Sequence, residues 1–280
     1  MLMAMLHNEN IVSAMEYDPE AHGNRLYCMD KTCKAPVIFV PGSENISPHF
    51  KTTGKGDSVH STSCGFYEPL DLVGSIKKVK EYQDDKLQEN MNEIVIRLSM
   101  NRIDPDREVA TVEREKREKK PNELKVKNEN LTPQTISSVK GVVKLLTEHE
   151  PDILSSILIN VGGGHKVPLS QIIVNQDEAH KILWEDKMLK NVDYFVYGRV
   201  ANIVKRETVM YVNFEETDVP FTLVVFKKHW KDFSYTEEKL KGKDVLVYGH
   251  LRKNDYNNKR LTEMIIKSDK YLEKIKRKEK

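Results

Sequence analysis

The sequence predicts a multi-domain α+β protein. Its 280 residues are enough for about two domains of ordinary size. All three cysteines lie near the N-terminus, 16 of the 27 residues from 104 to 130 are charged, and strand patterns dominate after Tyr194. We therefore divide the chain into an N-terminal module (1–70), a charged, partly helical connector (71–130), a small α+β segment (131–190) and a β-rich C-terminal domain (191–280).

The composition is typical of a soluble globular protein with exposed linkers. Charged residues make up 31% of the chain, and 45 Lys+Arg nearly balance 43 Asp+Glu to give a net charge of +2. No stretch reaches the ~20 apolar residues that span a bilayer. The opening MLMAMLHNENIV also lacks the basic and apolar regions of a signal peptide. We expect a cytoplasmic protein without membrane contact.

The spacing of the cysteines predicts a metal site. Four residues separate Cys28 from Cys33, three separate His60 from Cys64, and 26 lie between the two pairs. Two short-spaced pairs joined by a loop are typical of tetrahedral Zn²⁺ sites. Three thiolates and one imidazole fill the coordination sphere and leave no position for a catalytic water. We expect a structural zinc ion, with His49 as the alternative fourth ligand.

The same region resembles the N-terminal zinc module of the CoiA-like competence proteins. The resemblance covers about residues 26–64 and includes the apolar run ending at Val40 and the stretch Pro48-His49-Phe50. The sequence departs from that family in having Cys-x4-Cys rather than Cys-x2-Cys, and Thr52 in place of a second histidine. In that family a following domain carries nuclease chemistry on clustered acidic residues, which implies a metal-dependent nuclease, with acidic residues between 70 and 130, as an alternative function.

The middle of the chain alternates between helical and strand patterns. We expect a helix over 75–90, a strand over 93–100, and a helix that begins at Thr132-Pro133 and ends near His149. Two strands, 157–161 and 167–174, then flank a glycine turn. Asn175 and Glu178 have the spacing of a capping box at the start of another helix. Residues 177–180 spell DEAH, but no P-loop accompanies them, so we interpret the acidic pair as first-turn charges of that helix.

The C-terminal domain resembles an OB-fold, a five-stranded, partly open β-barrel. The pattern predicts strands at 194–204, 209–214, 221–226, 244–252 and 260–267, with a short helix over 235–240. One helix after the third of five strands is the OB-fold order, which is widely used to bind oligonucleotides. Gly198 and Gly249 occupy equivalent places in two similar strands, and we expect each to allow a bulge or bend.

Basic and aromatic residues are interleaved in this domain. Residues 191–280 hold 20 Lys+Arg and 14 Asp+Glu, a net charge of +6, whereas residues 1–190 hold 25 and 29, a net charge of −4. Strand alternation places Tyr197, Arg199, Tyr211 and Asn213 opposite the expected core. With cations and aromatic residues from the loops, these residues form a candidate nucleic-acid site: Tyr197, Arg199, Tyr211, Asn213, Lys227, Lys228, Trp230, Arg252, Lys253, Tyr256 and Arg260.

These patterns favour a binding protein over an enzyme. Aromatic stacking combined with phosphate contacts is how OB-folds bind single strands. We therefore expect weak binding of single-stranded DNA or RNA, with little sequence preference. Two alternatives remain open: the nuclease, and an adaptor whose OB face binds a protein partner.

Overall fold

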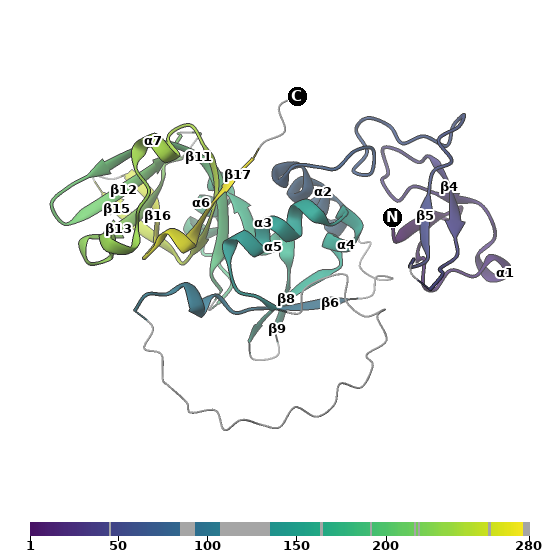
Figure 1. Ribbon diagram of the computed structural model, residues 1–280, viewed down its shortest axis with the longest axis horizontal. Coiled ribbons are helices and arrows are strands. Elements are labelled where there is room, and N and C mark those ends of the chain that lie inside the picture. Colours follow the sequence, from purple (N-terminus) through teal and green to yellow (C-terminus); the bar gives the residue numbers. More distant parts are fainter. Residues whose placement is uncertain are drawn as a thin grey trace, which may run out of the picture.

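The computed structural model describes residues 1–44, 46–84, 93–106, 135–162, 165–190, 192–215, 217, 219–256 and 259–276. These residues form three β-sheets with helices, so the architecture is mixed α+β. The N-terminal and C-terminal sheets lie at opposite ends of the molecule, and the central sheet lies between them with its helices (Figure 1). Among the described residues, no helix is both long and apolar enough to cross a membrane.

The N-terminal sheet has the strand order β2-β1-β3-β4-β5. Its small core is formed by side chains that alternate along these short strands, including Ala4, Leu6, Val37 and Phe50. The apolar run that ends at Val40 forms β4. The elements are β1 Met3–Leu6, β2 Ile11–Ser13, α1 Pro19–His22, β3 Leu26–Tyr27, β4 Pro36–Val40 and β5 His49–Lys51.

The central sheet has the order β7-β6-β8-β9. β6 and β7 lie on either side of residues 107–134 in the sequence, yet they pair in parallel, with Leu98 opposite Ile136. The connector and the α+β segment therefore share one sheet. Its elements are α2 Leu72–Asp84, β6 Ile94–Leu98, η2 Met100–Ile103, β7 Thr135–Ile136, α3 Val139–Glu148, α4 Pro151–Ser155, β8 Ile157–Gly162 and β9 His165–Pro168.

Two predictions in this region were wrong in their boundaries. The helix expected from Pro133 begins at Val139, because the preceding residues extend as β7 and Ser138 caps the helix by accepting a hydrogen bond from the amide of Gly141. Thr132 and Pro133 lie outside the described residues. The strand expected over 167–174 is interrupted by the helical turn α5 Leu169–Ile172, after which β10 Ile173–Asn175 pairs with another sheet.

The capping box is confirmed at α6 Gln176–Trp184. The Asn175 side chain accepts from the Glu178 amide at 2.8 Å, and the Glu178 carboxylate accepts from the Asn175 amide at 3.1 Å. Both bonds satisfy amides that the first helical turn leaves without partners.

The C-terminal sheet is curled and mostly antiparallel. Its described strands follow the order β15-β16-β13-β12-β11-β14-β17, and β10 joins β11 in parallel. His250 alone separates β14 from β15, so the chain bends sharply there. β15, at one end of the strand order, therefore directly continues β14, which is next to the other end. The elements are β11 Tyr194–Lys205, β12 Val209–Phe214, β13 Phe221–Phe226, η3 Lys227–Asp232, α7 Glu237–Leu240, β14 Asp244–Gly249, β15 Leu251–Tyr256, β16 Lys259–Ile265, η4 Asp269–Tyr271 and β17 Leu272–Ile275.

Two glycines allow this curl. A Cβ on Gly198 would lie 2.5 Å from the Phe214 ring, and one on Gly249 would lie 2.9 Å from Cγ of Met264. Both contacts are closer than carbon atoms tolerate, so a side chain at either position would push the sheet apart. The register of β11 against β12 also shifts between Val200 and Asn202, which adds the expected bulge near the first glycine.

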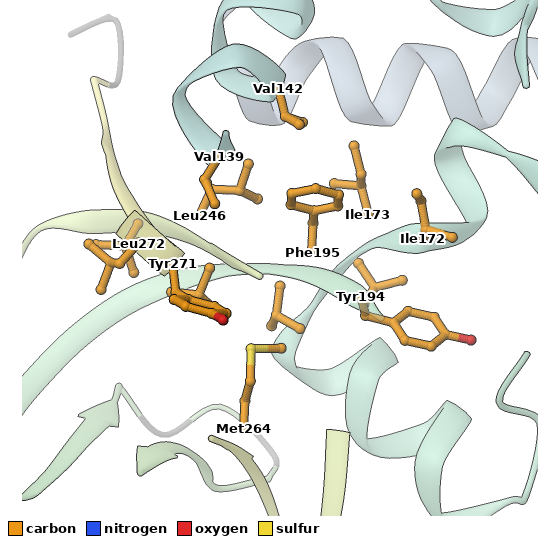
Figure 2. Close-up of a cluster of buried hydrophobic side chains, with 14 of the residues drawn as sticks. Val139, Val142, Ile172, Ile173, Tyr194, Phe195, Leu246, Met264, Tyr271 and Leu272 are labelled. Carbon is orange, nitrogen blue, oxygen red and sulfur yellow. The ribbon is translucent and has the colours of Figure 1, made fainter. Parts of the chain in front are cut away.

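The curled sheet packs against the central helices through one side. Phe195 on β11 and Leu246 on β14 point toward Val139 and Val142 of α3, and all four side chains are buried (Figure 2). The outward side of β11 and β14 is thereby covered in this part of the sheet. Beyond the register shift between Val200 and Asn202, the outward side chains of β11 and β12 continue the same side of the sheet.

Candidate functional site

Two turns bring the predicted metal ligands together. Cys28 directly follows β3, and the chain then turns at Asp30, whose carbonyl accepts from the amides of Cys33 and Lys34. The Asp30 carboxylate also accepts from the Thr32 amide at 3.0 Å, a local bond that stabilises such turns. A second turn, in which the Cys64 amide donates to the Ser61 carbonyl, lies in the loop after β5.

The ligand atoms have the spacing of a tetrahedral centre. Sγ of Cys28 lies 3.6 Å from Sγ of Cys64, and Nδ1 of His60 lies 3.5 Å from the sulfurs of both Cys33 and Cys64. All four ligand atoms lie within 4.8 Å of one another. Metal–sulfur bonds of about 2.3 Å and a metal–nitrogen bond of about 2.0 Å place tetrahedral ligands about 3.5 to 3.8 Å apart. Cys28, Cys33, His60 and Cys64 are therefore close enough to bind one metal ion.

The surroundings favour the ligating forms of His60 and Cys64, whereas the hydrogen bond to Cys64 and burial raise the pKa of the Cys28 thiol. Burial lowers the pKa of His60, which favours the neutral imidazole that can coordinate a metal. A hydrogen bond from Cys28 lowers the pKa of Cys64 to about 7. The amide of Phe66 donates to Sγ of Cys64, and the amide of Ser61 donates to Sγ of Cys33, both at 3.4 Å.

Asp30 connects this centre to the central helices. Its Oδ2 accepts from Lys78 Nζ at 2.8 Å and Tyr82 Oη at 2.9 Å, both on α2, and from the Gly65 amide at 3.1 Å. Burial by itself raises the pKa of Asp30, but the bonds from Lys78, Thr32, Gly65 and Tyr82 outweigh it and lower the pKa to about 2. Asp30 is thus a buried anion that ties the metal module to α2.

His49, the alternative ligand, lies outside this cluster. It belongs to β5, and its Nδ1 is 3.0 Å from the Ser47 carbonyl. Among the described residues, the Cys28, Cys33, His60 and Cys64 set is the one group of three or more such ligand atoms gathered this closely. The nuclease alternative assigned its acidic residues to the segment 70–130. Residues 85–92 and 107–130 of that segment lie outside the described residues.

The outer face of the curled sheet contains two of the predicted nucleic-acid residues, Tyr211 and Asn213. Both lie on β12, between the inward residues Met210, Val212 and Phe214, and both are partly exposed. Tyr211 pairs across the sheet with Val204, which is 40% exposed. An aromatic ring and an apolar side chain are therefore accessible side by side on this face.

A row of polar side chains crosses the same face. Thr222 Oγ1 donates to Asn213 Oδ1 at 3.1 Å, and Asn213 Nδ2 donates to Asn202 Oδ1 at 2.7 Å. Thr222 is paired with Glu263, which is nearly buried and accepts from Arg252 at 2.9 Å and Asn254 at 2.6 Å. Asn202, at the end of this row, is exposed.

Tyr197 and Arg199 do not lie in this row. Tyr197 is only partly exposed and packs against the main core, and its burial raises its pKa to about 12. Arg199 is opposite Asp244 and donates to it at 3.1 Å. They precede the bulge at Ala201, on the part of β11 that pairs with β10 and β14.

The predicted loop cations lie at two other edges. Lys227, Lys228 and Trp230 are on η3, where Lys205 Nζ lies 4.0 Å from the Trp230 ring centroid. Lys253 and Arg260 lie 5.4 and 5.3 Å from the Trp184 ring on α6, on the side away from Arg252. The backbone of Tyr256 ends β15, and its side chain lies outside the described residues.

Sequence reasoning missed several residues of these sites. Asn202, Thr222 and Glu263 complete the polar row, and strand alternation on β13 and β16 was the available signal. Asp104 and Asp106 follow η2 and pair with Lys267 at 2.8 and 3.1 Å, and Asp106 lies 3.4 Å from Lys228. No sequence signal connects residues so far apart.

No protein-family model matches the chain, and no curated protein sequence matches it. The resemblances to OB-fold domains and to the CoiA-like zinc module rest on the residues named for them.

Proposed function

We propose that residues 191–280 form an OB-fold that binds single-stranded nucleic acid on the outer face of β11, β12 and β13. The pairing of the strands supports this proposal. Counting β14 with β15 as one bent strand, the first strand pairs with the second and fourth, the second with the third, and the third in parallel with the fifth. The fifth pairs back with the fourth. This is the connectivity of a five-stranded Greek-key barrel.

The observation that carries the binding proposal is the accessible pair of Tyr211 and Asn213 on β12. Any of the bases can stack on a tyrosine ring, and this stacking contributes about 1 to 3 kcal/mol of binding free energy per base. The amides of Asn202 and Asn213 lie beside this ring and offer hydrogen bonds to base edges or phosphates. Stacking and amide contacts together suit a splayed single strand better than a duplex.

The charge pattern explains why the proposed binding is weak. Arg199, Arg252 and Lys267 each pair with a carboxylate. A cation that is already paired gains less from a phosphate than a free one does. The +6 charge of this domain therefore overstates its attraction for a nucleic-acid backbone.

Fluorescence anisotropy with a labelled single strand of about 12 nucleotides tests this function. We expect saturable binding that weakens as salt rises, because phosphate contacts release counterions. Tyr211→Ala is expected to lower the affinity by about 5- to 100-fold. Tyr67→Ala is the matched control, since Tyr67 is an exposed tyrosine of the N-terminal module. Unchanged anisotropy at low salt, or equal losses in both variants, would contradict the proposal.

The second part of the proposal is that the Cys3His centre holds a structural zinc ion. Thiolate and imidazole ligands at tetrahedral spacing suit Zn²⁺, and four protein ligands leave no open position. The centre would therefore stabilise the small N-terminal sheet, whose strands contain two to five residues. Elemental analysis of the purified protein is expected to give about one zinc per chain.

The adaptor remains the second candidate because of Val204. This residue is 40% exposed beside Tyr211, and an exposed apolar and aromatic pair also suits a protein partner. Binding of single strands that is lost in Tyr211→Ala favours the nucleic-acid function. Absence of such binding, together with capture of a protein that Tyr211→Ala fails to retain, favours the adaptor.

A further inference from the structure

A pocket of about 370 Å³ lies where α2, α5, α6 and the start of β11 meet. It is distinct from both the metal centre and the outer face of the curled sheet. Its apolar lining comes from Val174, Ile182, Leu189 and the ring of Tyr194. Its volume is in the range of small-molecule sites, and such sites often occur where two structural units join.

Tyr194 lines this pocket and carries a hydroxyl group. Tyr194 is 1% exposed, and its Oη accepts a hydrogen bond from the Leu189 amide at 2.9 Å. Within the described part of the chain, no acceptor is found for the hydroxyl proton. In Figure 2 the Tyr194 hydroxyl points away from Phe195 and the buried cluster. The proton is therefore available to an acceptor atom inside the pocket.

The rim of the pocket is positively charged. Lys80, Lys181 and Lys187 line it, with Glu178 as the one acidic lining residue. Lys80 pairs with Glu178 at 2.5 Å, and Lys187 pairs with Glu185 at 2.6 Å. Lys181 is exposed and has no ion pair among the described residues. Lys181 is thus the cation best placed to neutralise a bound anion.

We propose that this pocket binds a small organic anion. Its apolar body lies against Val174, Ile182 and Leu189. The anionic group of the ligand, a phosphate, carboxylate or sulfonate, lies at Lys181 and accepts a hydrogen bond from the Tyr194 hydroxyl. Apolar contact supplies affinity, whereas the lysine and the hydroxyl select for the charge and orientation of the ligand.

Two fluorescent probes test the site in the full-length protein. Anilinonaphthalene sulfonate has an apolar ring system with an anionic group, and phenylnaphthylamine has the same ring system without the charge. We expect saturable binding of the sulfonate, about tenfold tighter than the uncharged probe, a difference that one ion pair in a partly buried site supplies. Lys181→Glu is expected to remove this preference, whereas Lys140→Glu, a charge reversal at an exposed lysine of α3, keeps it.

Tyr194→Phe provides a second measurement. We expect it to lower the affinity for the sulfonate probe severalfold and to leave the affinity for the uncharged probe nearly unchanged. Tyr211→Ala is expected to bind both probes as the wild type does, which separates this pocket from the outer face of the curled sheet. Thermal unfolding of each variant shows whether it is folded. Equal affinities for the two probes in the wild type, or an unchanged preference in folded Lys181→Glu, would overturn the proposal.

Discussion

The phenol of Tyr82 donates a 2.9 Å hydrogen bond to Asp30, although 52 residues separate them in sequence. Asp30 lies between two of the metal ligands, and Tyr82 lies on α2 beside Lys78, which contacts the same carboxylate oxygen at 2.8 Å. Three groups thus converge on one buried atom, counting the amide of Gly65. This carboxylate, together with the packing of Met29 against Tyr82, holds the turn that presents Cys28 and Cys33 against a helix of the central unit.

Asp30→Asn is expected to destabilise the protein by about 2 to 3 kcal/mol. The amide keeps the size of the side chain but removes the charge that accepts from Lys78, and hydrogen bonds to charged groups contribute about 1.5 to 3 kcal/mol. Urea unfolding measures the loss. Asp57→Asn is the control, because Asp57 is an exposed acidic residue of the same module.

Metal content separates this role from metal binding. Asp30 does not belong to the Cys3His set, so folded Asp30→Asn is expected to retain its metal. A variant as stable as Asp57→Asn would show that the carboxylate does not stabilise the contact with α2.

Removal of the metal is expected to unfold the N-terminal module selectively. Its core, which includes Ala4, Leu6 and Phe50, is separate from the main core of the central and C-terminal units. Without the metal, the bonds that would join the two ligand-bearing turns are lost, and such small modules depend on metal for stability. Limited proteolysis with and without a chelator checks this, with new cleavage expected before residue 70. A cleavage pattern that the chelator leaves unchanged, in protein shown to have lost its metal, would contradict this expectation.

The carboxylates of Asp104 and Asp106 are expected to weaken nucleic-acid binding, if the C-terminal domain has the function proposed for it. They pair with Lys267 and Lys228 and occupy cations that otherwise attract phosphates. The double variant Asp104→Asn and Asp106→Asn is expected to bind single strands severalfold more tightly, with a salt dependence steeper by about one or two phosphate contacts.

A matched double variant controls for net charge. Asp57→Asn with Glu68→Gln also removes two negative charges, at exposed positions of the N-terminal module. Anisotropy titrations of the two double variants provide the comparison. Equal gains in affinity would mean that the contacts of Asp104 and Asp106 with the lysines have no specific effect.

Stability is expected to fall below about pH 6.5 because of His180. Trp184 Nε1 donates to Thr262 Oγ1 at 3.2 Å, and the same hydroxyl shares a hydrogen bond of 2.8 Å with Nδ1 of His180. A neutral imidazole can accept the hydroxyl proton in this bond, whereas a protonated ring cannot. Burial, followed by the charge of Arg260, lowers the pKa of His180 below its ordinary value.

The direction of the pH effect follows from proton binding. The unfolded chain takes up a proton near pH 6.5, whereas the folded protein takes it up only at a lower pH, so acid favours unfolding between these two values. Urea midpoints at about pH 7.5 and 5.0 measure the loss. His180→Asn offers an oxygen acceptor that does not titrate. Its urea midpoint is therefore expected to fall less between these two pH values than that of the wild type. A pH dependence identical in both proteins would exclude His180 as the group responsible.

Much of the metal centre was predictable from the sequence because its chemistry depends on local spacing. The Cys-x4-Cys and His-x3-Cys pairs each lie in one turn, and the structure brings all four side chains together. The capping box at Asn175 and Glu178 was predictable for the same reason. The five predicted strands of the C-terminal domain follow their apolar alternation closely, apart from the break at His250 in the fourth, but β17 was not predicted.

Predictions failed where distant residues compete for the backbone. Thr135 and Ile136 were expected to be helical, but they extend because β6 offers them backbone hydrogen bonds. Tyr197 points to the outward side of β11, as strand alternation predicts. What the sequence did not show is that Tyr197 packs against the main core there, where β10 pairs with β11 and Asn175 lies opposite Tyr197.

The sequence by itself determined the four residues of the Cys3His cluster, most of the C-terminal strands and the concentration of positive charge after residue 190. Each depends on identity or on spacing of a few residues. Only the tertiary structure decided which of the basic and aromatic residues share a face, that Asp30 joins the metal module to α2, and that Lys181 and Tyr194 line one pocket. These relationships depend on strand register and helix packing, which bring together residues that local spacing does not relate.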